Sequence, residues 1–302
     1  MKVSHLFFSF LFLSLLLFQC TVNDVNNDQG DILLQGPPPD GKGKPDNDGG
    51  GENPLPGETW NLIFEDEFDG DLSAWDIWEG GAFNEELQLY RGDQLSLSEG
   101  ILTIKTQREA VTGATSIYDA TPKGFEYVSG RIETKTLFGP SGVEGEVEYR
   151  FEARIKLPAG NGMWPAFWTY GDPWPTQGEI DILEARGQNI TEFQSNIFYG
   201  RRPNRNINRN TEQHYETGVD LTAGFHVYDM IWKAESIDIL FDGNLLYTYI
   251  ANRDNNVSSL FGKKEKVVLN NAVGGLFFSD RNSANYADNA IMEVDWVRVY
   301  KR

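Results

Sequence analysis

Residues 179–184 read Glu-Ile-Asp-Ile-Leu-Glu, and this stretch decides how the chain is interpreted. Because successive side chains of a β-strand point to opposite faces, Glu179 and Asp181 share one face and the two isoleucines share the other. Glu184 follows Glu179 at an odd offset, which sends it to the core side of a regular strand. One extra residue, a β-bulge near Ile182–Leu183, returns it to the acidic face. The stretch predicts a bulged strand with three carboxylates on one face.

Such a row of carboxylates is electrostatically unfavourable, because like charges on one strand face repel one another. Glycoside hydrolysis needs this arrangement. Two carboxyls about 5–5.5 Å apart act as nucleophile and as acid/base, with retention of configuration. Asp181, between the two glutamates, would hydrogen-bond the nucleophile and raise the pKa of the acid by its charge. The alternative is a solvated strand face that happens to be acidic.

An aromatic stretch, Trp-Pro-Ala-Phe-Trp-Thr-Tyr, begins upstream at Trp164. As a strand it places Trp164, Trp168 and Tyr170 on one face, where rings could stack on the C–H faces of sugars. Core packing is the alternative for each ring. We expect Trp164 and Trp168 at the substrate and Phe167 in the core. Pro165 argues against a central ladder position, because it has no N–H to donate.

Several stretches resemble glycoside hydrolase family 16, specifically its bulged, laminarinase-like branch. The most specific is the acidic motif with its lead, residues 174–178 (Trp-Pro-Thr-Gln-Gly). Supporting stretches are residues 60–70, 84–90, 129–135, 152–158 and 292–300. The resemblance covers nearly all of residues 60–302.

The resemblance implies an all-β fold, a β-jelly-roll sandwich of two antiparallel sheets with a concave substrate cleft. The sequence supports this independently. Residues 58–302 suit one large all-β domain, and short β-rich runs are separated by Gly, Asn and Asp. Asp242-Gly243, between two strand-like runs, predicts a hairpin with a type I′ turn.

The resemblance also implies roles for individual residues. Glu179 corresponds to the nucleophile, Asp181 to its helper and Glu184 to the acid/base. The positions that match residues lining the substrate cleft are Asn84, Glu86 and Arg131. For these, ordinary loop and strand-end hydrogen bonding is the alternative.

A structural calcium ion is a further implication, because Asp295 matches an aspartate that holds Ca²⁺ in many relatives together with backbone oxygens near Glu67 and Gly100. Calcium needs several oxygen ligands at roughly 2.3–2.6 Å, which these could supply in part. The three histidines show no metal-binding spacing. We expect no cofactor in catalysis.

The N-terminus has the pattern of an export signal. A weakly basic start precedes the apolar run Leu6–Phe18, and the single cysteine, Cys20, follows it. This predicts a lipoprotein-type signal peptide over residues 1–19 and lipidation at Cys20, although residues 17–19 lack the usual small side chains. A non-lipidated signal is the alternative. Residues 20–57, rich in Asp, Asn, Gly and Pro, predict a disordered tether. We expect an exported protein on the outer membrane, facing the cell surface or the periplasm.

The net charge of −19, from 45 acidic and 26 basic residues, argues against nucleic acid as a partner. Four arginines nevertheless cluster within a short stretch, Arg201, Arg202, Arg205 and Arg209. Guanidinium groups suit sulfate or carboxylate, so this stretch could meet an anionic sugar. A solvated loop paired with the protein's own acids is the alternative. We expect a polysaccharide as partner and a monomeric protein.

Two classes of function remain open. The first is a retaining endo-glycoside hydrolase that cleaves internal β-1,3, or mixed β-1,3/1,4, linkages of laminarin-type β-glucan. Its rivals are hydrolysis of a galactan (agar, porphyran or carrageenan) and transglycosylation. The second class is a noncatalytic glycan-binding protein on the same fold. The complete acidic row favours an enzyme.

Overall fold

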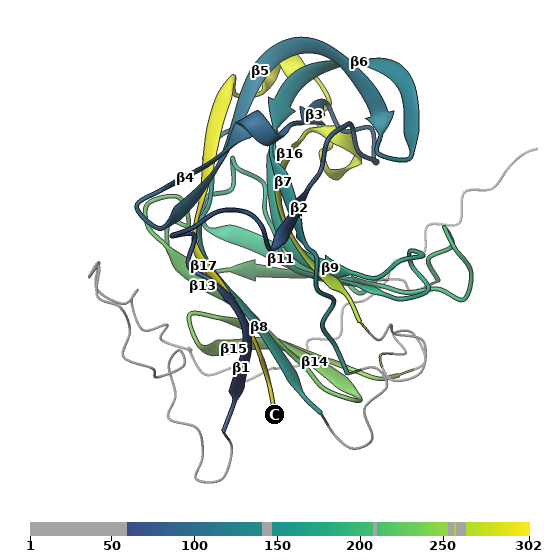
Figure 1. Cartoon of the computed structure of the whole chain (residues 1–302), viewed down its shortest axis with the longest axis vertical. Coiled ribbons are helices and arrows are strands. Elements are labelled where there is room, and N and C mark those ends of the chain that lie inside the picture. The colour runs from purple at the N-terminus through teal and green to yellow at the C-terminus, as the bar shows by residue number, and fades with distance from the viewer. Residues whose placement is uncertain (1–58, 141–146, 208–209, 253–256, 258–263) are drawn as a thin grey trace, which may run out of the picture. The chain divides into compact units, whose positions relative to one another are not determined.

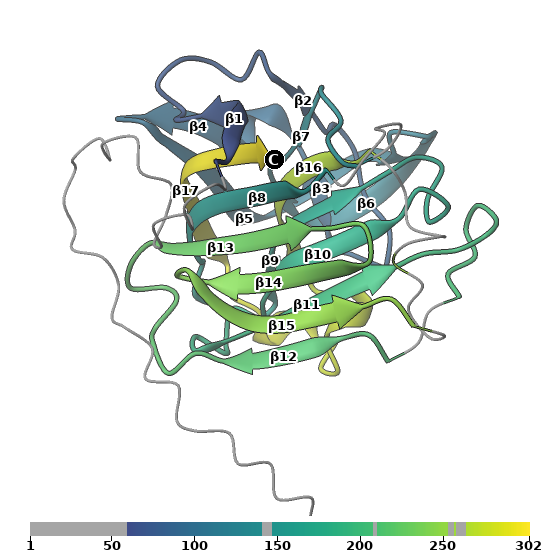
Figure 2. The same cartoon turned by 90° about the horizontal axis from the view of Figure 1, so that it is seen from below.

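The computed structural model describes residues 59–140, 147–207, 210–252, 257 and 264–302. Its strands form two sheets (Figures 1 and 2). The larger sheet runs β15 (Asn244–Ile250), β14 (Ser236–Phe241), β13 (His226–Trp232), β8 (Tyr149–Lys156), β17 (Asn289–Lys301), β5 (Ile101–Ser116), β6 (Asp119–Ser129) and β3 (Gln88–Tyr90), with β1 (Asn61–Asp66) on β17 and β4 (Leu95–Ser98) on β5.

The smaller sheet carries the acidic motif on its third strand. Its order is β12 (Gln213–Glu216), β11 (Glu192–Phe198), β10 (Glu179–Glu184), β9 (Met163–Tyr170), β16 (Lys266–Val273), β7 (Arg131–Thr134) and β2 (Trp75–Ile77). Among the described residues, three short 3₁₀ helices connect strands, namely η1 (Gly92–Gln94), η2 (Gly275–Phe277) and η3 (Ser283–Asn285). The predicted sandwich of two sheets is confirmed.

One strand pair departs from the purely antiparallel sheets that we predicted, because β3 runs parallel to β6. A tight hairpin cannot join parallel strands, since the second strand must start at the same end as the first. The chain meets this requirement by passing through η1, β4 and β5 before it returns as β6.

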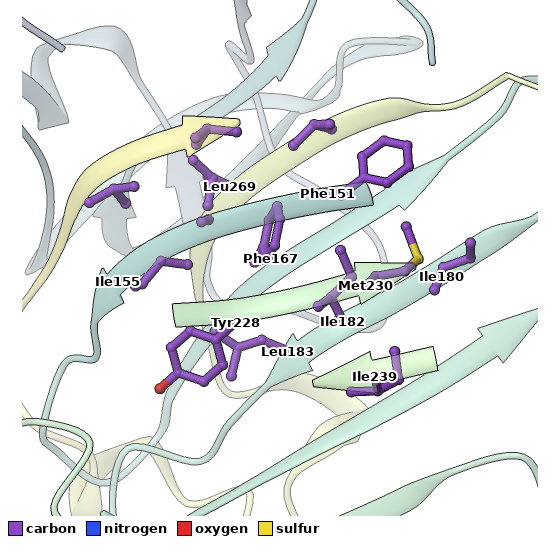
Figure 3. Packing of buried hydrophobic residues seen from close by; sticks show 14 of the residues in the cluster. Phe151, Ile155, Phe167, Ile180, Ile182, Leu183, Tyr228, Met230, Ile239 and Leu269 are labelled. Atoms are coloured by element: carbon purple, nitrogen blue, oxygen red, sulfur yellow. The ribbon is translucent and has the colours of Figure 1, made fainter. Parts of the chain in front are cut away.

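The core lies between the two sheets, and Figure 3 shows part of it. Phe151 and Met230 of the larger sheet and Phe167, Ile180 and Leu269 of the smaller one all have no exposed surface. Along β9 and β10 these apolar side chains alternate with polar or half-buried ones, because a strand presents its residues to opposite faces in turn. Burial of this face leaves the opposite face of β9 and β10 for the acids and aromatic rings.

The predicted hairpin turn at Asp242 and Gly243 is confirmed. Both residues have positive φ, 47° and 77°, as a type I′ turn requires. They connect β14 directly to β15.

The expectation for Pro165 was wrong, because Pro165 lies within β9, between β10 and β16. Its carbonyl accepts a hydrogen bond from the N–H of Ala185, at 3.1 Å. In an antiparallel ladder the N–H and C=O of one residue face the same neighbouring strand. The missing N–H of Pro165 therefore faces Ala185, just beyond the end of β10 at Glu184, where the ladder no longer needs it.

The predictions for the N-terminus, including Cys20 and the boundaries at residues 19 and 57, fall on residues 1–58, outside the described part. Within the described part, no helix is long and apolar enough to cross a membrane.

Candidate active site

The bulge in β10 is where the sequence predicts it. Against β9, the register shifts between Asp181 and Leu183, and against β11 it shifts between Asp181 and Glu184. Ile182 and Leu183 are consecutive residues, yet both are fully buried in the core. Because the bulge turns two successive side chains inward, Glu184 returns to the face that carries Glu179 and Asp181.

The three carboxylates differ in exposure. Asp181 is 4% exposed and lies between Trp168 of β9 and Asn196 of β11 in the ladder. Glu179 and Glu184 are half-buried at the two ends of the strand. The middle acid is therefore enclosed by its neighbours, whereas the outer two can be reached from solvent.

Burial raises the pKa of all three acids, and repulsion within the row adds to the effect for Glu179 and Asp181. The pKa of Glu179 rises to about 8, first through burial and then through the charge of Glu184. That of Glu184 rises to about 7, mainly through burial. The pKa of Asp181 lies well above its ordinary value for the same reasons. At neutral pH the row therefore keeps protons, and a hydrogen bond between two of its carboxyls becomes possible because one of them can donate.

Glu184 is held by hydrogen bonds from two sides. Trp164 donates through its indole Nε1 at 2.8 Å, and Gln194 donates through Nε2 at 3.3 Å. Arg186 in turn donates to the side-chain oxygen of Gln194 at 2.9 Å, and its charge lowers the pKa of Glu184. The predicted acid/base thus has a fixed orientation before any substrate binds.

Trp164 also packs against a residue that the sequence did not single out. Its ring lies parallel to that of Phe277, with centroids 4.2 Å apart, and the guanidinium of Arg186 lies 3.8 Å from the centre of the same phenylalanine. Trp164 lies on the predicted face, and its clearest contacts are to Glu184 and Phe277. Its role in binding sugar stays a prediction.

Glu179 pairs in the ladder with Tyr170 of β9 and with Phe198 of β11. Trp174 and the charge of Arg131 both act to lower the pKa of Glu179, against the larger effect of burial. Glu179 is therefore flanked by rings on both sides.

A fourth carboxyl lies close to the row. Glu265 is fully buried, accepts a hydrogen bond from Thr169 Oγ1 at 2.5 Å, and leaves its other oxygen without a partner among the described residues. Burial raises its pKa well above the ordinary value, and its charge contributes to the raised pKa of Asp181. No pattern in the sequence distinguished this glutamate.

Arg131 links the remaining aromatic residues. Its guanidinium lies 4.0 Å from the ring centre of Trp78 and 4.9 Å from that of Trp168, and it forms an ion pair with Glu133 at 2.6 Å. Trp168 also donates through Nε1 to Asn270 at 2.7 Å. Because Arg131 is only 5% exposed, these contacts fix the orientation of the rings on this face.

Asn84 and Glu86 lie in a loop that packs against Gly275. Asn84 has a positive φ of 57°, and a side chain on Gly275 would come within 2.6 Å of the Asn84 carbonyl oxygen. Glu86 is buried, accepts from Gln88 at 2.7 Å, and has a pKa raised by burial to about 7. The charge of Arg131 acts on it in the opposite direction, so the structure brings Glu86 and Arg131 together.

Of the predicted calcium ligands, the one side chain, that of Asp295, is already engaged with a cation. The Asp295 carboxylate pairs with Arg154, and the Glu67 carboxylate accepts two hydrogen bonds from Arg298. In the described residues no group of three acidic, His or Cys side chains could hold a metal ion. A side chain on Gly100 would come within 3.4 Å of the Glu67 carbonyl oxygen, so these two backbones do meet. The guanidinium beside Asp295 makes the donor set a poor fit for Ca²⁺.

The arginine stretch lies beside the Trp174 loop. Asn204 N–H donates to the Trp174 carbonyl at 2.8 Å, next to the residues that flank Glu179. Arg201, Arg202 and Arg205 are exposed, and none forms an ion pair with an acid in the part of the chain that the structure describes. Arg209 falls outside that part.

The sequence profile of the glycosyl hydrolases family 16 matches residues 90–298. The chain belongs to this family. Its relatives include the glucan endo-1,3-beta-glucosidase of Cryptopygus antarcticus, 32% identical over 265 residues, covering 80% of this chain and 92% of the relative. The glucan endo-1,3-beta-glucosidase A1 of Niallia circulans is 31% identical over 270 residues, covering 80% of this chain. The chain spans only 38% of that relative's length.

A solved structure of a β-glucanase has the same fold. The endo-beta-1,3-glucanase of Pyrococcus furiosus aligns with a TM-score of 0.65 and 30% identity, covering 80% of this chain and 94% of that one. The jelly-roll that the sequence predicts is thereby confirmed.

Proposed function

We propose that this family 16 chain is a retaining endo-glycoside hydrolase that cleaves internal β-1,3, or mixed β-1,3/1,4, linkages of laminarin-type β-glucan by double displacement. The observation that carries the proposal is the bulge in β10, which places Glu179, Asp181 and Glu184 on one face. The activities of the relatives, as their names state them, support the choice of β-1,3-glucan.

The chemistry follows from the two outer acids. The reactive form of the row is the one in which Glu179 is ionised and the retained protons lie on Asp181 and Glu184. In this form the Glu179 carboxylate attacks the anomeric carbon and forms a glycosyl ester, while the bond to the leaving oxygen breaks and Glu184 gives that oxygen its proton. Glu184, now a carboxylate, takes a proton from water. The resulting hydroxide displaces Glu179 from the anomeric carbon, so the configuration is retained and both acids return to their starting states.

The surroundings of the row fit these roles. Trp164 and Gln194 can donate to Glu184 in either protonation state, because a protonated carboxyl keeps an accepting oxygen. Arg131 supports charge on Glu179, which the first step requires. The raised pKa of Asp181 keeps a proton within the row that can be shared with Glu179. Proton and nucleophile both come from carboxyls and water, so the reaction calls for no cofactor.

The test is the release of reducing ends from a panel of polysaccharides by the purified full chain. The panel contains laminarin, mixed-linkage glucan, agarose, porphyran and carrageenan, and Glu179→Gln serves as the blank. We expect release from laminarin, with products of intermediate length that indicate internal cleavage. The proposal would be refuted if no member of the panel released reducing ends, or if the blank released as many as the parent.

Hydrolysis of an anionic galactan is a second candidate, favoured by the three exposed arginines that have no acidic partner among the described residues. Replacing Arg201, Arg202 and Arg205 together by Gln distinguishes the two. If the substrate is a neutral glucan, turnover of laminarin should change less than twofold. A loss confined to porphyran or carrageenan would identify this loop as the specificity element and replace the glucan proposal.

We also propose that the chain is exported and anchored in the outer membrane through a lipid on Cys20. The apolar run before Cys20 and the absence of any other cysteine in the sequence support this. The acidic, proline- and glycine-rich segment that follows would then hold the enzyme away from the membrane surface.

A further inference from the structure

The tip of the β5–β6 hairpin presents two large side chains to solvent. Ile117 and Tyr118 connect the strands and are 47% and 68% exposed. The base of the hairpin is part of the larger sheet, through pairing of β5 with β17. Figure 1 shows the two strands arching away from this base, toward the region of β2 and β7.

The tip is fixed to the segment that follows β2. Gly81 N–H donates to the Ala114 carbonyl at 2.9 Å, and the indole Nε1 of Trp78 donates to the Gly81 carbonyl at 2.9 Å. A side chain on Gly81 would come within 2.5 Å of the ring of Phe125, which shows how closely the hairpin lies against this segment. The Tyr118 ring meets Trp78 edge-on, with centroids 6.1 Å apart.

The same segment connects the tip to the face that carries the acids. Trp78 lies under the guanidinium of Arg131, and Arg131 also contacts Trp168, the ladder neighbour of Asp181. Among the charges that act on the pKa of Tyr118 are those of Glu133 and Arg131, both on β7. The Tyr118 phenol therefore lies over the β7 side of the acid-bearing face of the smaller sheet, although β5 and β6 belong to the larger sheet.

The strand pairing across the smaller sheet gives the distance that a bound substrate must span to touch this tip. Asp181 pairs with Trp168, Trp168 with Val268, and Val268 with Glu133, so three steps separate the acids from β7. At roughly 4.8 Å per step this is about 14 Å. A polysaccharide bound for cleavage at Glu179 and Glu184 could reach Tyr118 with its outer sugars, whereas a very short oligosaccharide could not.

The chemistry of the tip suits an uncharged sugar. Phe83, 53% exposed, also meets Trp78 edge-on with centroids 6.4 Å apart, so two exposed rings contact one buried ring. Exposed rings held rigidly by a buried neighbour offer flat apolar faces at little cost in conformational freedom. We propose that Tyr118 and Phe83 form an outlying subsite that stacks on a neutral pyranose ring of the polysaccharide being cleaved. This subsite rests on the proposed function.

The test compares Tyr118→Ala with Tyr118→Trp, which keeps a flat ring, in the full chain. Tyr247→Ala, which removes an exposed tyrosine on β15 at the opposite end of the same, larger sheet, is the matched control. For Tyr118→Ala we expect KM for laminarin to rise roughly 2- to 10-fold with kcat nearly unchanged, as the value of one aromatic contact implies. The effect should disappear on the shortest laminarioligosaccharides that are still cleaved, and Tyr118→Trp should restore the parent KM.

An unchanged KM for Tyr118→Ala on laminarin, or an equal rise for Tyr247→Ala, would overturn the subsite. Failure of the proposed function gives a different result, because the parent itself would then leave laminarin uncut. In that event the same variants are compared on whichever polysaccharide of the panel is cleaved. If none is cleaved, retardation in native gels containing laminarin decides, and a mobility of Tyr118→Ala equal to that of the parent refutes the subsite.

Discussion

Trp164 lies parallel to Phe277, with 6° between the ring planes, and directs its indole N–H at Glu184. The stack therefore fixes the direction from which the predicted acid/base receives its hydrogen bond. A rigid donor next to a half-buried carboxyl controls both its position and its pKa. Phe277 thereby acts on Glu184 through Trp164.

Replacing Trp164 by Phe removes the N–H and keeps an aromatic ring. Because this hydrogen bond lowers the pKa of Glu184, its loss should raise that pKa and move the alkaline limb of the kcat/KM profile to higher pH. We expect kcat to fall roughly 10-fold, the cost of one lost charge-assisted hydrogen bond. Phe277→Leu is the control, since it keeps the N–H and should shift the limb less. An alkaline limb at the parent position would contradict the role of Trp164.

The two outer acids should respond differently to the leaving group. Glu179→Gln and Glu184→Gln should each reduce cleavage of polysaccharide by a factor of about 10² or more. On an aryl glycoside whose phenolate leaves without a proton, Glu184→Gln should recover much of the loss in the first step, whereas Glu179→Gln should not. The rate of phenolate release by each variant measures this difference. Recovery by Glu179→Gln instead would exchange the two assignments, and near-normal turnover in either variant would reject them.

The acidic row should make the protein less stable as the pH rises. For Glu179 the pKa in the folded chain, about 8, exceeds the ordinary value of 4.5, so the folded state holds its proton more tightly than the unfolded state. This contribution is complete below pH 4.5 and is lost as the pH rises toward 8. Glu179→Gln, which needs no proton, should therefore raise Tm by a few degrees at pH 8 and hardly at pH 5.

Thermal unfolding of the parent, Glu179→Gln and the exposed Glu235→Gln at both pH values checks this expectation. Glu235→Gln should leave Tm unchanged at either pH. An increase of the same size at pH 5 and pH 8 for Glu179→Gln would show that the stabilisation does not come from the proton.

Anchoring can be tested independently of catalysis. Cys20→Ala should move the protein from the membrane fraction to the soluble fraction, because the lipid has no other attachment site among the residues of the chain. Specific activity on laminarin should stay the same within error. Continued recovery of the variant with membranes would argue against a lipid anchor at this cysteine.

Features that depend on neighbouring residues were predicted from the sequence. The alternation of Glu179, Ile180 and Asp181, the extra residue before Glu184 and the turn at Asp242 are all local, and the structure contains each of them. The error at Pro165 shows the limit of local reasoning. A missing N–H weakens the ladder only where the neighbouring strand continues. The sequence of β9 gives no indication of where β10 ends.

Contacts between distant segments were not predicted. Trp168 and Asn270, which share a hydrogen bond, are 102 residues apart, and Arg131 and Trp78 meet only because β7 lies next to β2. Glu265 escaped notice because nothing near it in the sequence distinguishes it from a surface glutamate. The β5–β6 tip folds over the opposite sheet because its two long strands curve. No local pattern in the sequence predicts the degree of that curvature.

The bulge in β10 has an evolutionary consequence. Ile182 and Leu183 together occupy core positions, so deletion of either one would restore a regular strand in which Glu184, at an even offset from Glu179, still lies on the acidic face. A single lost codon would thus remove the bulge and one core side chain while all three carboxylates and the aromatic face remain. The acidic row can therefore pass between a bulged and a regular strand in a single codon step, in either direction, without losing the face that carries it.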